Sequence, residues 1–270
     1  MTAERLLDAV RPWIERKLGA SLSEAGSDPI PVLVAAEEAE DRTPLWAVKV
    51  GAEAVIVARP LWVDQLRPVV AGLHADQLFS IFGAYEMARI TLPDGVAVWG
   101  PSWYMFGDET TVRSVRRKRP VKVVPSELVG VDWDVFWHCA ADVALAGFAV
   151  FEKDQVAALA TVWDDEEPVW EIGIDVAPDA RGRGLGQEVV AAAVDWILEN
   201  GRVPLATVGP FNVPSARTLR SVGLRYVMSD MKGIKGPFQV PPQPVGRPYE
   251  GVALHDYYPA WAMNKDIVRR

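Results

Sequence analysis

The chain has 270 residues, of which 50% are hydrophobic and 24% are charged, and its formal net charge is −8. That length allows one large domain or two ordinary ones, each with a substantial core. The acidic balance argues against a general binder of nucleic acid or of anionic membranes. The single cysteine, Cys139, excludes an internal disulfide and gives no sign of an oxidising compartment.

The chain begins with a predicted amphipathic helix, because Leu6, Val10, Ile14 and Leu18 recur every four residues. This segment has no long apolar core and no small-residue cleavage site, so it does not read as a secretory signal. The longest apolar stretch, 143–151, is far shorter than the roughly 20 residues that span a bilayer. These features predict a cytoplasmic protein.

Up to about residue 125 the sequence predicts an α+β domain of unknown role, with strand-like pieces "LWAVKV", "AVIVARPLWV" and "GVAVWGPSWYMFG". Its tryptophans favour a core role over a ligand cage, and Trp99, Trp103 and Tyr104 are candidates for the wall of a cleft. The basic run "RSVRRKRPVK", residues 113–122, indicates either a phosphate or nucleic-acid patch or an exposed connector. The acidic chain favours the connector.

Residues 126–236 show a regular alternation of elements. The patterns predict a helix at 132–145, a hairpin of strands 147–152 and 156–163, a strand at 169–176, a helix at 186–201, a strand at 203–209, a short helix at 213–223 and a strand at 224–233. Many prolines after Gly236 predict an extended tail. The predicted division is therefore 1–125, 126–236 and 237–270.

The stretch "VAPDARGRGLGQE" places three glycines between a predicted strand and a predicted helix. Gly182, Gly184 and Gly186 permit a bare backbone whose N–H groups form a nest for an anion. The helix start adds unpaired N–H groups and the positive end of its dipole, and Arg181 and Arg183 add charge at the rim. The loop therefore predicts a phosphate ligand, above all a pyrophosphate.

Three other interpretations of this loop can be weighed. A nucleoside-triphosphate loop needs a Gly-Lys-Ser/Thr ending, and no lysine follows these glycines. A dinucleotide loop needs G-x-G-x-x-G, and Gln187 occupies the place of the last glycine. A plain glycine turn without a ligand stays open.

A family resemblance fits the loop better. Arg181, Gly184 and Gly186 form R-x-x-G-x-G after Val176-x-Pro178, which resembles the coenzyme A pyrophosphate loop of the GNAT (general N-acetyltransferase) superfamily. The stretch "NVPSARTLRSVGL" resembles that family's second motif through Asn212, Ser215, Gly223 and Leu224. The resemblance covers about 127–235 and extends to the branch with a long N-terminal half. It implies an α/β GNAT fold with a mixed, splayed central sheet in the C-terminal half, beside the α+β N-terminal domain.

The resemblance also implies a reaction. Acetyl-CoA, or another acyl-CoA, would donate its acyl group to a primary amine of a small molecule or peptide, with no metal, nucleic acid or membrane involved. The family holds coenzyme A between two splayed strands, and the strand before the loop bonds its pantetheine arm. The implied coenzyme A-binding residues are Ile174, Asp175, Val176, Arg181, Gly182, Arg183, Gly184, Leu185, Gly186, Gln187, Asn212 and Ser215.

Catalysis would need a base for the amine. Side chains alternate along 169–176, so Glu171 and Asp175 share the face opposite the apolar residues. Some family members carry a carboxylate at nearly this place, which makes Glu171 the candidate base; an exposed strand carboxylate without a role is the alternative. The family's tyrosine in the short helix is Leu219 here, so Tyr226 becomes the candidate acid.

Other catalytic patterns are weak. His74, His138 and His255 lie far apart and no H-E-x-x-H occurs, which argues against a metal site. In the predicted helix, His138 and Cys139 point about 100° apart, which favours a buried cysteine over a nucleophile. Two further hypotheses stay open: a non-catalytic acyl-CoA-binding regulatory module, motivated by Leu219, and a binder of anionic partners through 113–122.

Overall fold

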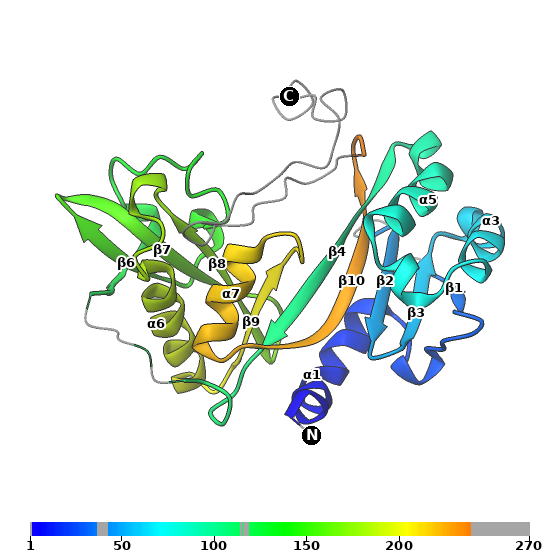
Figure 1. The fold of residues 1–270 in the computed structure, drawn as a ribbon, viewed down its shortest axis with the longest axis horizontal. Helices are drawn as coiled ribbons and strands as arrows, with labels where there is room; N and C mark the ends of the chain where they lie inside the picture. The colour runs from blue at the N-terminus through cyan, green and yellow to red at the C-terminus, as the bar shows by residue number, and fades with distance from the viewer. Residues whose placement is uncertain (1, 37–42, 114, 116–118, 239–270) are drawn as a thin grey trace, which may run out of the picture.

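The computed structural model describes residues 2–36, 43–113, 115 and 119–238. In this part of the chain ten strands form one mixed sheet, in the order β1-β3-β2-β10-β4-β9-β8-β7-β6-β5. Figure 1 shows β1 to β3, with α3 and α5, at one end of this sheet and the hairpin of β6 and β7 at the other, with β4 and β10 between them. The predicted tail lies outside the described residues from 239 onward.

The N-terminal half contains more helix than the sequence patterns suggest. Its elements are α1 (Thr2–Leu18), β1 (Val32–Val34), β2 (Leu45–Val50), β3 (Glu53–Ala58), α3 (Pro60–Ala71), α4 (Ala75–Leu78), α5 (Ile81–Thr91) and β4 (Val96–Phe106). The predicted first helix is confirmed. The strand-like stretch "AVIVARPLWV" is only half strand, because Pro60 starts α3 there. A proline suits the first helical position, where its fixed φ fits and no N–H is needed.

The C-terminal half follows the predicted order after residue 145. Its elements are β5 (Val121–Val123), β6 (Ala146–Glu152), β7 (Gln155–Asp164), β8 (Val169–Val176), α6 (Leu185–Glu199), β9 (Val203–Val208), α7 (Val213–Val222) and β10 (Arg225–Lys235). Strand β8 has the bounds that its alternation predicts. The α/β fold with a mixed central sheet is confirmed.

The predicted helix at 132–145 is wrong. The segment consists of turns, bends and one 3-10 turn at Ala141–Val143. The Asp132 carboxylate accepts the N–H of Asp134 at 3.0 Å, and the N–H of His138 donates to the Asp175 carboxylate at 2.8 Å. These side-chain partners take backbone N–H groups that a helix would use. Phe136 and Cys139 are buried in a small cluster with β6 and β7, so tertiary packing decides the conformation.

Strand β4 joins the two halves of the molecule. It lies between β9 and β10, antiparallel to both, although it comes from the N-terminal half of the chain. β10 in turn pairs with β2 on its other side. The sheet therefore runs without a break across the predicted boundary at residues 125 and 126, and that division of the chain stays a prediction.

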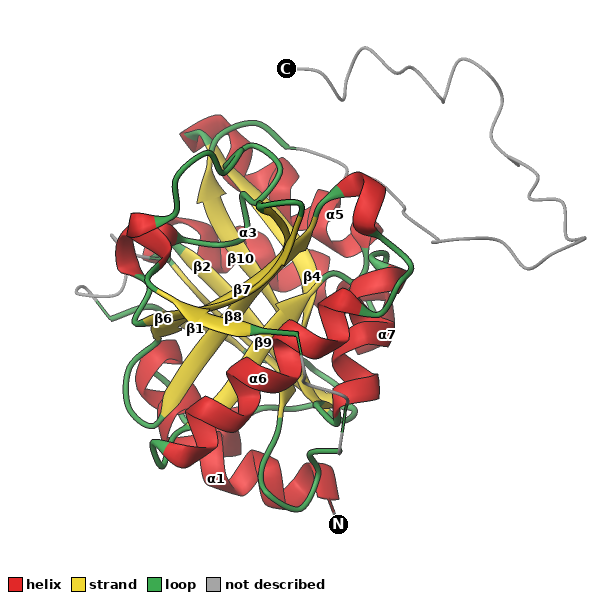
Figure 2. Ribbon diagram, turned by 90° about the vertical axis from the view of Figure 1, so that its left-hand side faces the viewer, coloured by secondary structure: helices red, strands yellow, loops and turns green. Residues whose placement is uncertain are grey.

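The two faces of the sheet are covered differently (Figure 2). Helices α3 to α5 pack on one end of the first face, and α6 and α7 pack on the other end. Helix α1 covers the middle of the second face, where its buried side chains meet Tyr104, Phe106 and Leu205. We call the face that carries α3 to α7 the first face, and the face that carries α1 the second face.

The central strands separate in the middle of the sheet. β8 and β9 are parallel and pair only from Val169 with Val203 to Glu171 with Leu205. Beyond Glu171, β8 continues beside β7 and β9 continues beside β4. A gap therefore opens between β8 and β9, with its vertex at Glu171. No helix among the described residues is long and apolar enough to cross a bilayer.

Candidate active site

The glycine loop, residues 177–184, joins β8 to α6. Gly182 and Gly184 have φ values of +75° and +79°, in the left-handed region that favours glycine. Gly184 is the N-cap of α6, and no side chain caps this helix. The N–H groups of Leu185, Gly186 and Gln187 therefore lack intrahelical partners. A Cβ built on Gly184 meets nothing within 4 Å, so space for an anion lies in front of the loop.

The two loop arginines brace the loop from within. Arg181 Nε donates to the carbonyl of Val176 at 3.1 Å. Arg183 Nε donates to the carbonyl of Ala180 at 3.3 Å, and its guanidinium also pairs with Glu152. These contacts order the backbone of the loop, and the Glu152 carboxylate offsets the charge of Arg183.

Gly186 has a packing role. A Cβ at this position would lie 3.3 Å from Ile174 Cδ1 and from Val176 Cγ2, and 3.6 Å from Thr218 Cγ2. The missing side chain lets α6 approach both β8 and α7. The third glycine of the stretch therefore shapes the site through helix packing, whereas the first two shape the backbone of the loop.

One residue of β8 presents its backbone to the gap. The N–H of Ala177 donates to the carbonyl of Ala157 at 2.9 Å, which fixes the hydrogen-bonding alternation along the antiparallel pair. Asp175 accordingly directs its backbone to β7, whereas Ile174 and Val176 direct theirs toward β9. The carbonyl of Val176 already accepts Arg181, so Ile174 is the residue whose N–H and C=O face the gap.

Asp175 uses its side chain elsewhere. Its carboxylate accepts the N–H of His138 at 2.8 Å and lies 2.8 Å from His138 Nδ1. Gly173 lies between Glu171 and Asp175 on the same face, and a Cβ there would come within 2.0 Å of the His138 carbonyl oxygen. The segment that contains His138 therefore lies directly on the second face of β8.

Asn212 and Ser215 form the start of α7. Asn212 is its N-cap, and the Asn212 Oδ1 accepts the N–H of Ser215 at 3.3 Å. Because α7 packs against α6 through buried residues such as Leu219, this helix start lies on the first face, as the glycine loop does. The structure thus gathers the predicted coenzyme A-binding residues around one end of the gap, except for the side chain of Asp175.

Glu171 lies at the vertex of the gap and points into the second face. Its Oε1 accepts a hydrogen bond from Thr207 Oγ1 at 2.8 Å. Burial raises the pKa of Glu171 to about 7, although the hydrogen bond from Thr207 acts in the opposite direction. A carboxyl group with such a pKa can take up and release a proton near neutral pH, as a general base must.

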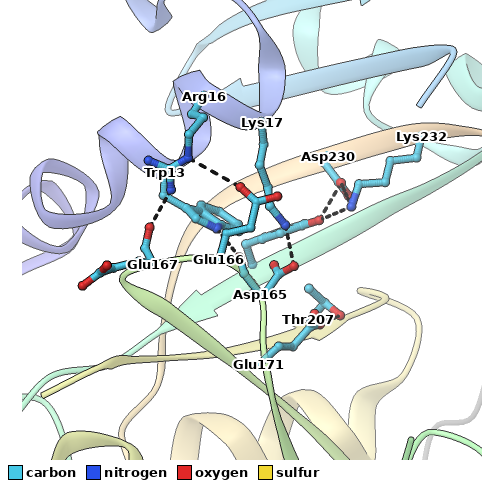
Figure 3. Close-up of polar contacts among 11 residues, drawn as sticks. Trp13, Arg16, Lys17, Asp165, Glu166, Glu167, Glu171, Thr207, Asp230 and Lys232 are labelled. Atoms are coloured by element: carbon cyan, nitrogen blue, oxygen red, sulfur yellow. Dashed lines mark hydrogen bonds and ion pairs between the residues drawn. The ribbon is translucent and has the colours of Figure 1, made fainter. Parts of the chain in front are cut away.

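Glu171 lines a cavity of about 230 Å³, the Glu171 cavity, drawn in part in Figure 3. Helix α1, strands β2, β4, β8, β9 and β10, and the turn after β7 all contribute to it. The lining residues are Trp13, Lys17, Trp46, Trp99, Ser102, Tyr104, Asp165, Glu171, Thr207, Asp230, Lys232 and Ile234. Both halves of the chain therefore build this cavity, and three of its rings are tryptophans.

A hydrogen-bonded group around Asp230 forms one wall of the Glu171 cavity. The buried Asp230 carboxylate accepts from Trp46 Nε1 and from the Tyr104 hydroxyl, both at 2.8 Å, and Lys232 Nζ lies 3.5 Å away. Lys232 also donates to the Tyr104 oxygen at 2.7 Å. Burial, then the charge of Asp230, raises the pKa of Tyr104 well above its usual value. Tyr104 therefore stays protonated as a hydrogen-bond donor.

Helix α1 closes the opposite wall. Trp13 Nε1 donates to the carbonyl of Asp165 at 2.7 Å, and Lys17 forms an ion pair with the Asp165 carboxylate. These contacts hold α1 on the turn between β7 and β8 (Figure 3). The N-terminal helix thus completes a cavity whose candidate base comes from the C-terminal half.

The second predicted catalytic residue, Tyr226, lies apart from the first. Its hydroxyl is 2.9 Å from Ser229 Oγ, and its ring packs edge to face against Trp103. Both rings line a separate groove, which does not include Glu171. Tyr104 is the tyrosine that shares a cavity with Glu171.

Sequence reasoning missed Asp230, Lys232 and Thr207. The charged residues Asp230 and Lys232, which flank Met231 within a predicted strand, were the available signal, because a buried strand carboxylate needs partners. Cys139 behaves as predicted in one respect: it is buried, and burial raises the pKa of its thiol to about 12. An unreactive thiol follows.

The basic run is only partly described, because residues 114 and 116–118 lie outside the described part of the chain. Arg119 Nε lies 3.1 Å from both carboxylate oxygens of the buried Glu188, and Lys122 Nζ lies 4.6 Å from the centre of a Trp196 ring. These two residues are used in packing, in agreement with the connector interpretation. Across the described residues, no three His, Cys, Asp or Glu side chains group as metal ligands would.

Comparison with known families finds one match, in the C-terminal part of the chain. Residues 112–224, less than half of the chain, match the model of the acetyltransferase (GNAT) family. This range contains the glycine loop, Glu171 and both ends of α7. No curated protein matches the sequence.

Solved structures with a similar fold include three proteins of this family. A GNAT-family acetyltransferase from Novosphingobium aromaticivorans is 19% identical, with a TM-score of 0.42 over 52% of this chain and 66% of its own. One from Colwellia psychrerythraea is 13% identical, with a TM-score of 0.40 over 52% and 58%. A GCN5-related N-acetyltransferase from Kribbella flavida is 13% identical, with a TM-score of 0.40 over 71% and 90%. The chain thus spans less than two thirds of the first two proteins.

Proposed function

Because residues 112–224 are a GNAT acetyltransferase domain, we propose that the protein transfers an acetyl group from acetyl-CoA to a primary amine of a small molecule. Acyl transfer from an acyl-CoA is the general activity of the family. One observation carries the specific proposal. Glu171, with a pKa of about 7, sits at the vertex where the gap between β8 and β9 meets a cavity on the second face.

The donor would bind on the first face. The N–H groups of Leu185, Gly186 and Gln187, with the open backbone of Gly184, suit a pyrophosphate. The backbone of Ile174 would bond the pantetheine arm in the gap. A backbone N–H directed at the developing oxyanion is worth about 3 kcal/mol. The thioester would then lie at the vertex, beside Glu171.

The acceptor would occupy the Glu171 cavity. Its volume of about 230 Å³ lies below the roughly 300–1,000 Å³ of common ligand pockets, which favours a small acceptor over a peptide. Trp99 offers a ring face that attracts a cationic amine, whereas Lys232 Nζ already lies over the rings of Trp46 and Tyr104, at 5.1 and 5.5 Å from their centres. Donor and acceptor would thus approach the vertex from opposite faces of the sheet.

Glu171 would act as the general base. It takes a proton from the amine, the amine nitrogen attacks the thioester carbonyl, and the C–N bond forms as the C–S bond breaks. The thiol has an ordinary pKa near 8.5, so its thiolate leaves with little help. Tyr104 shares this cavity, but its hydroxyl donates to Asp230 and its pKa is raised, so it is a poor proton donor for the thiolate, and we assign no residue the acid role first given to Tyr226.

The non-catalytic acyl-CoA-binding module is the second candidate. Leu219, a buried residue, stands where family members carry a tyrosine that protonates the thiolate. A protein of this kind would bind acetyl-CoA without releasing free thiol when amines are added. Measuring free coenzyme A over a panel of small amines separates the two candidates.

The experiment that tests the base is Glu171→Gln. Its rate at pH 7 should fall about 100-fold, with unchanged acetyl-CoA affinity, because a positioned base contributes about that factor. The wild-type kcat/KM should rise with pH to a midpoint near 7. Glu53→Gln, at an exposed strand carboxylate on β3, serves as the control. An unchanged rate in Glu171→Gln would mean that another group takes the proton from the amine.

A further inference from the structure

A second hollow lies outside the acyl-transfer site, on the first face of the sheet. This groove has a volume of about 950 Å³ and lies between α7 and the N-terminal elements. Trp103 and Met105 of β4 line it with Tyr226 and Ser229 of β10. The groove is within the size range of small-molecule sites.

The walls of the groove are strongly basic. Its lining includes five cationic side chains and one carboxylate, in a chain whose net charge is −8: Lys49, Arg113, Arg217, Arg220, Arg225 and Asp76. Lys49 pairs with that carboxylate at 2.9 Å, which leaves Arg217, Arg220 and Arg225 as the cationic side chains that the groove offers to a ligand. Like charges gathered along one hollow create a field that concentrates anions.

The arginines are held by the fold. Arg217 and Arg220 are three residues apart on α7, so their side chains leave the same face of the helix. Arg225 Nη1 donates to the carbonyls of Arg220 and Leu224, both at 3.4 Å. The backbone N–H of Arg113 donates to Val222 at 2.8 Å, which ties the loop after β4 to the end of α7. Planar guanidinium groups suit phosphate oxygens.

Aromatic surface lies beside these charges. The rings of Trp103 and Tyr226 meet edge to face, with their centres 5.8 Å apart. Tyr226 is 37% exposed, and its hydroxyl is held by Ser229. An exposed ring next to arginines provides a stacking surface for a base and charges for its phosphates.

We propose that this groove binds a nucleotide, with its phosphates on Arg217, Arg220 and Arg225 and its base on Tyr226. The site is distinct from the glycine loop. Thr218 lies on the side of α7 that meets Gly186 of α6, and at 100° per residue Arg217 and Arg220 leave α7 from a different side. The proposal does not depend on the acyl-transfer chemistry.

Calorimetric titration of ATP and of inorganic tripolyphosphate into the full chain tests the groove. Saturating coenzyme A is present throughout, so that the glycine loop is filled. Arg217→Ala with Arg220→Ala should weaken both ligands at least tenfold, because two charge-assisted contacts are lost. Arg67→Ala with Arg89→Ala removes the same charge from exposed sites on α3 and α5, and should leave both affinities unchanged.

Tyr226→Leu tests the base contact. It should weaken ATP several-fold and leave tripolyphosphate unchanged, because stacking contributes only when a base is present. An equal effect on the two ligands overturns the contact with Tyr226. The proposal as a whole fails if, in the presence of coenzyme A, the wild type binds neither ligand, or if the double arginine variant binds both as the wild type does.

Discussion

The glycine loop and the Glu171 cavity are two sites built on different principles. The loop consists of consecutive residues, and its anion nest is made of backbone N–H groups around Gly182 and Gly184. The cavity consists of side chains that come from both halves of the chain and meet only in the folded sheet. The first site can therefore be recognised from a short stretch of sequence, whereas the second depends on the whole topology.

The two sites also differ in how readily a substitution changes the ligand that they accept. A backbone nest serves any molecule that carries the same phosphates, because it reads main-chain geometry. A side-chain cavity changes with one substitution on α1, β2, β4 or β10 without any change in the loop. Under the proposed function, donor binding and acceptor choice would thus be encoded in separate parts of the chain, with Glu171 between them.

The largest expected effect comes from a charge placed in the nest. Gly184→Asp should weaken coenzyme A binding by well over tenfold, because a carboxylate would occupy the space of a phosphate and repel it. Gly51→Asp is the matched control, since Gly51 also has a positive φ, +59°, with open space around it. Calorimetric affinities compare the two. Equal losses in both variants would attribute the effect to backbone strain, and the nest would lose its support.

Much of the fold near the loop could be predicted because its signals are local. Strand β8 shows a strict alternation, and its predicted bounds, 169–176, match the structure. The prediction of a helix at 132–145 was wrong because its apolar residues pack in an irregular segment, in which the N–H of His138 donates to Asp175. Local periodicity does not reveal such long-range partners.

The position of β4 could not be predicted. The stretch "GVAVWGPSWYMFG" indicates a strand, but nothing in it names β9 and β10 as neighbours. Tyr104 and Asp230 are 126 residues apart in sequence, yet their side chains are 2.8 Å apart in the structure. This contact cannot be predicted unless β4 is known to lie beside β10. The Glu171 cavity therefore could not be predicted, whereas strand alternation together with the family resemblance indicated Glu171 itself as a candidate base.

The next prediction concerns the charge balance of the cavity wall. Lys232→Met leaves the buried Asp230 carboxylate without its cation and should lower the free energy of unfolding by about 1–2 kcal/mol, a value reduced because Lys232 is partly exposed. Lys235→Met, at the exposed end of the same strand, should have little effect. Denaturant unfolding measures both.

Adding Asp230→Asn to Lys232→Met sharpens this result. The second change removes the unpaired charge, so the double variant should be more stable than Lys232→Met alone. A double variant that is less stable than either single variant would show that the Asp230 carboxylate contributes through Trp46 and Tyr104 rather than through Lys232.

The smallest expected effect is the pH dependence of stability that Glu171 introduces. Its pKa in the folded protein, about 7, lies above the ordinary value of 4.5, so the folded state retains this proton to higher pH than the unfolded chain does. The stability that protonated Glu171 gives is complete below about pH 4.5 and is lost as the pH rises through 7. The wild type should therefore lose stability relative to Glu171→Gln over this interval, on the order of 1 kcal/mol after allowance for partial exposure. Melting curves of both proteins from pH 4.5 to 8 measure the difference. The stability of Glu53→Gln should change with pH as that of the wild type does. If the stability of Glu171→Gln follows that of the wild type at every pH, Glu171 is an ordinary strand carboxylate and is not poised near neutral pH.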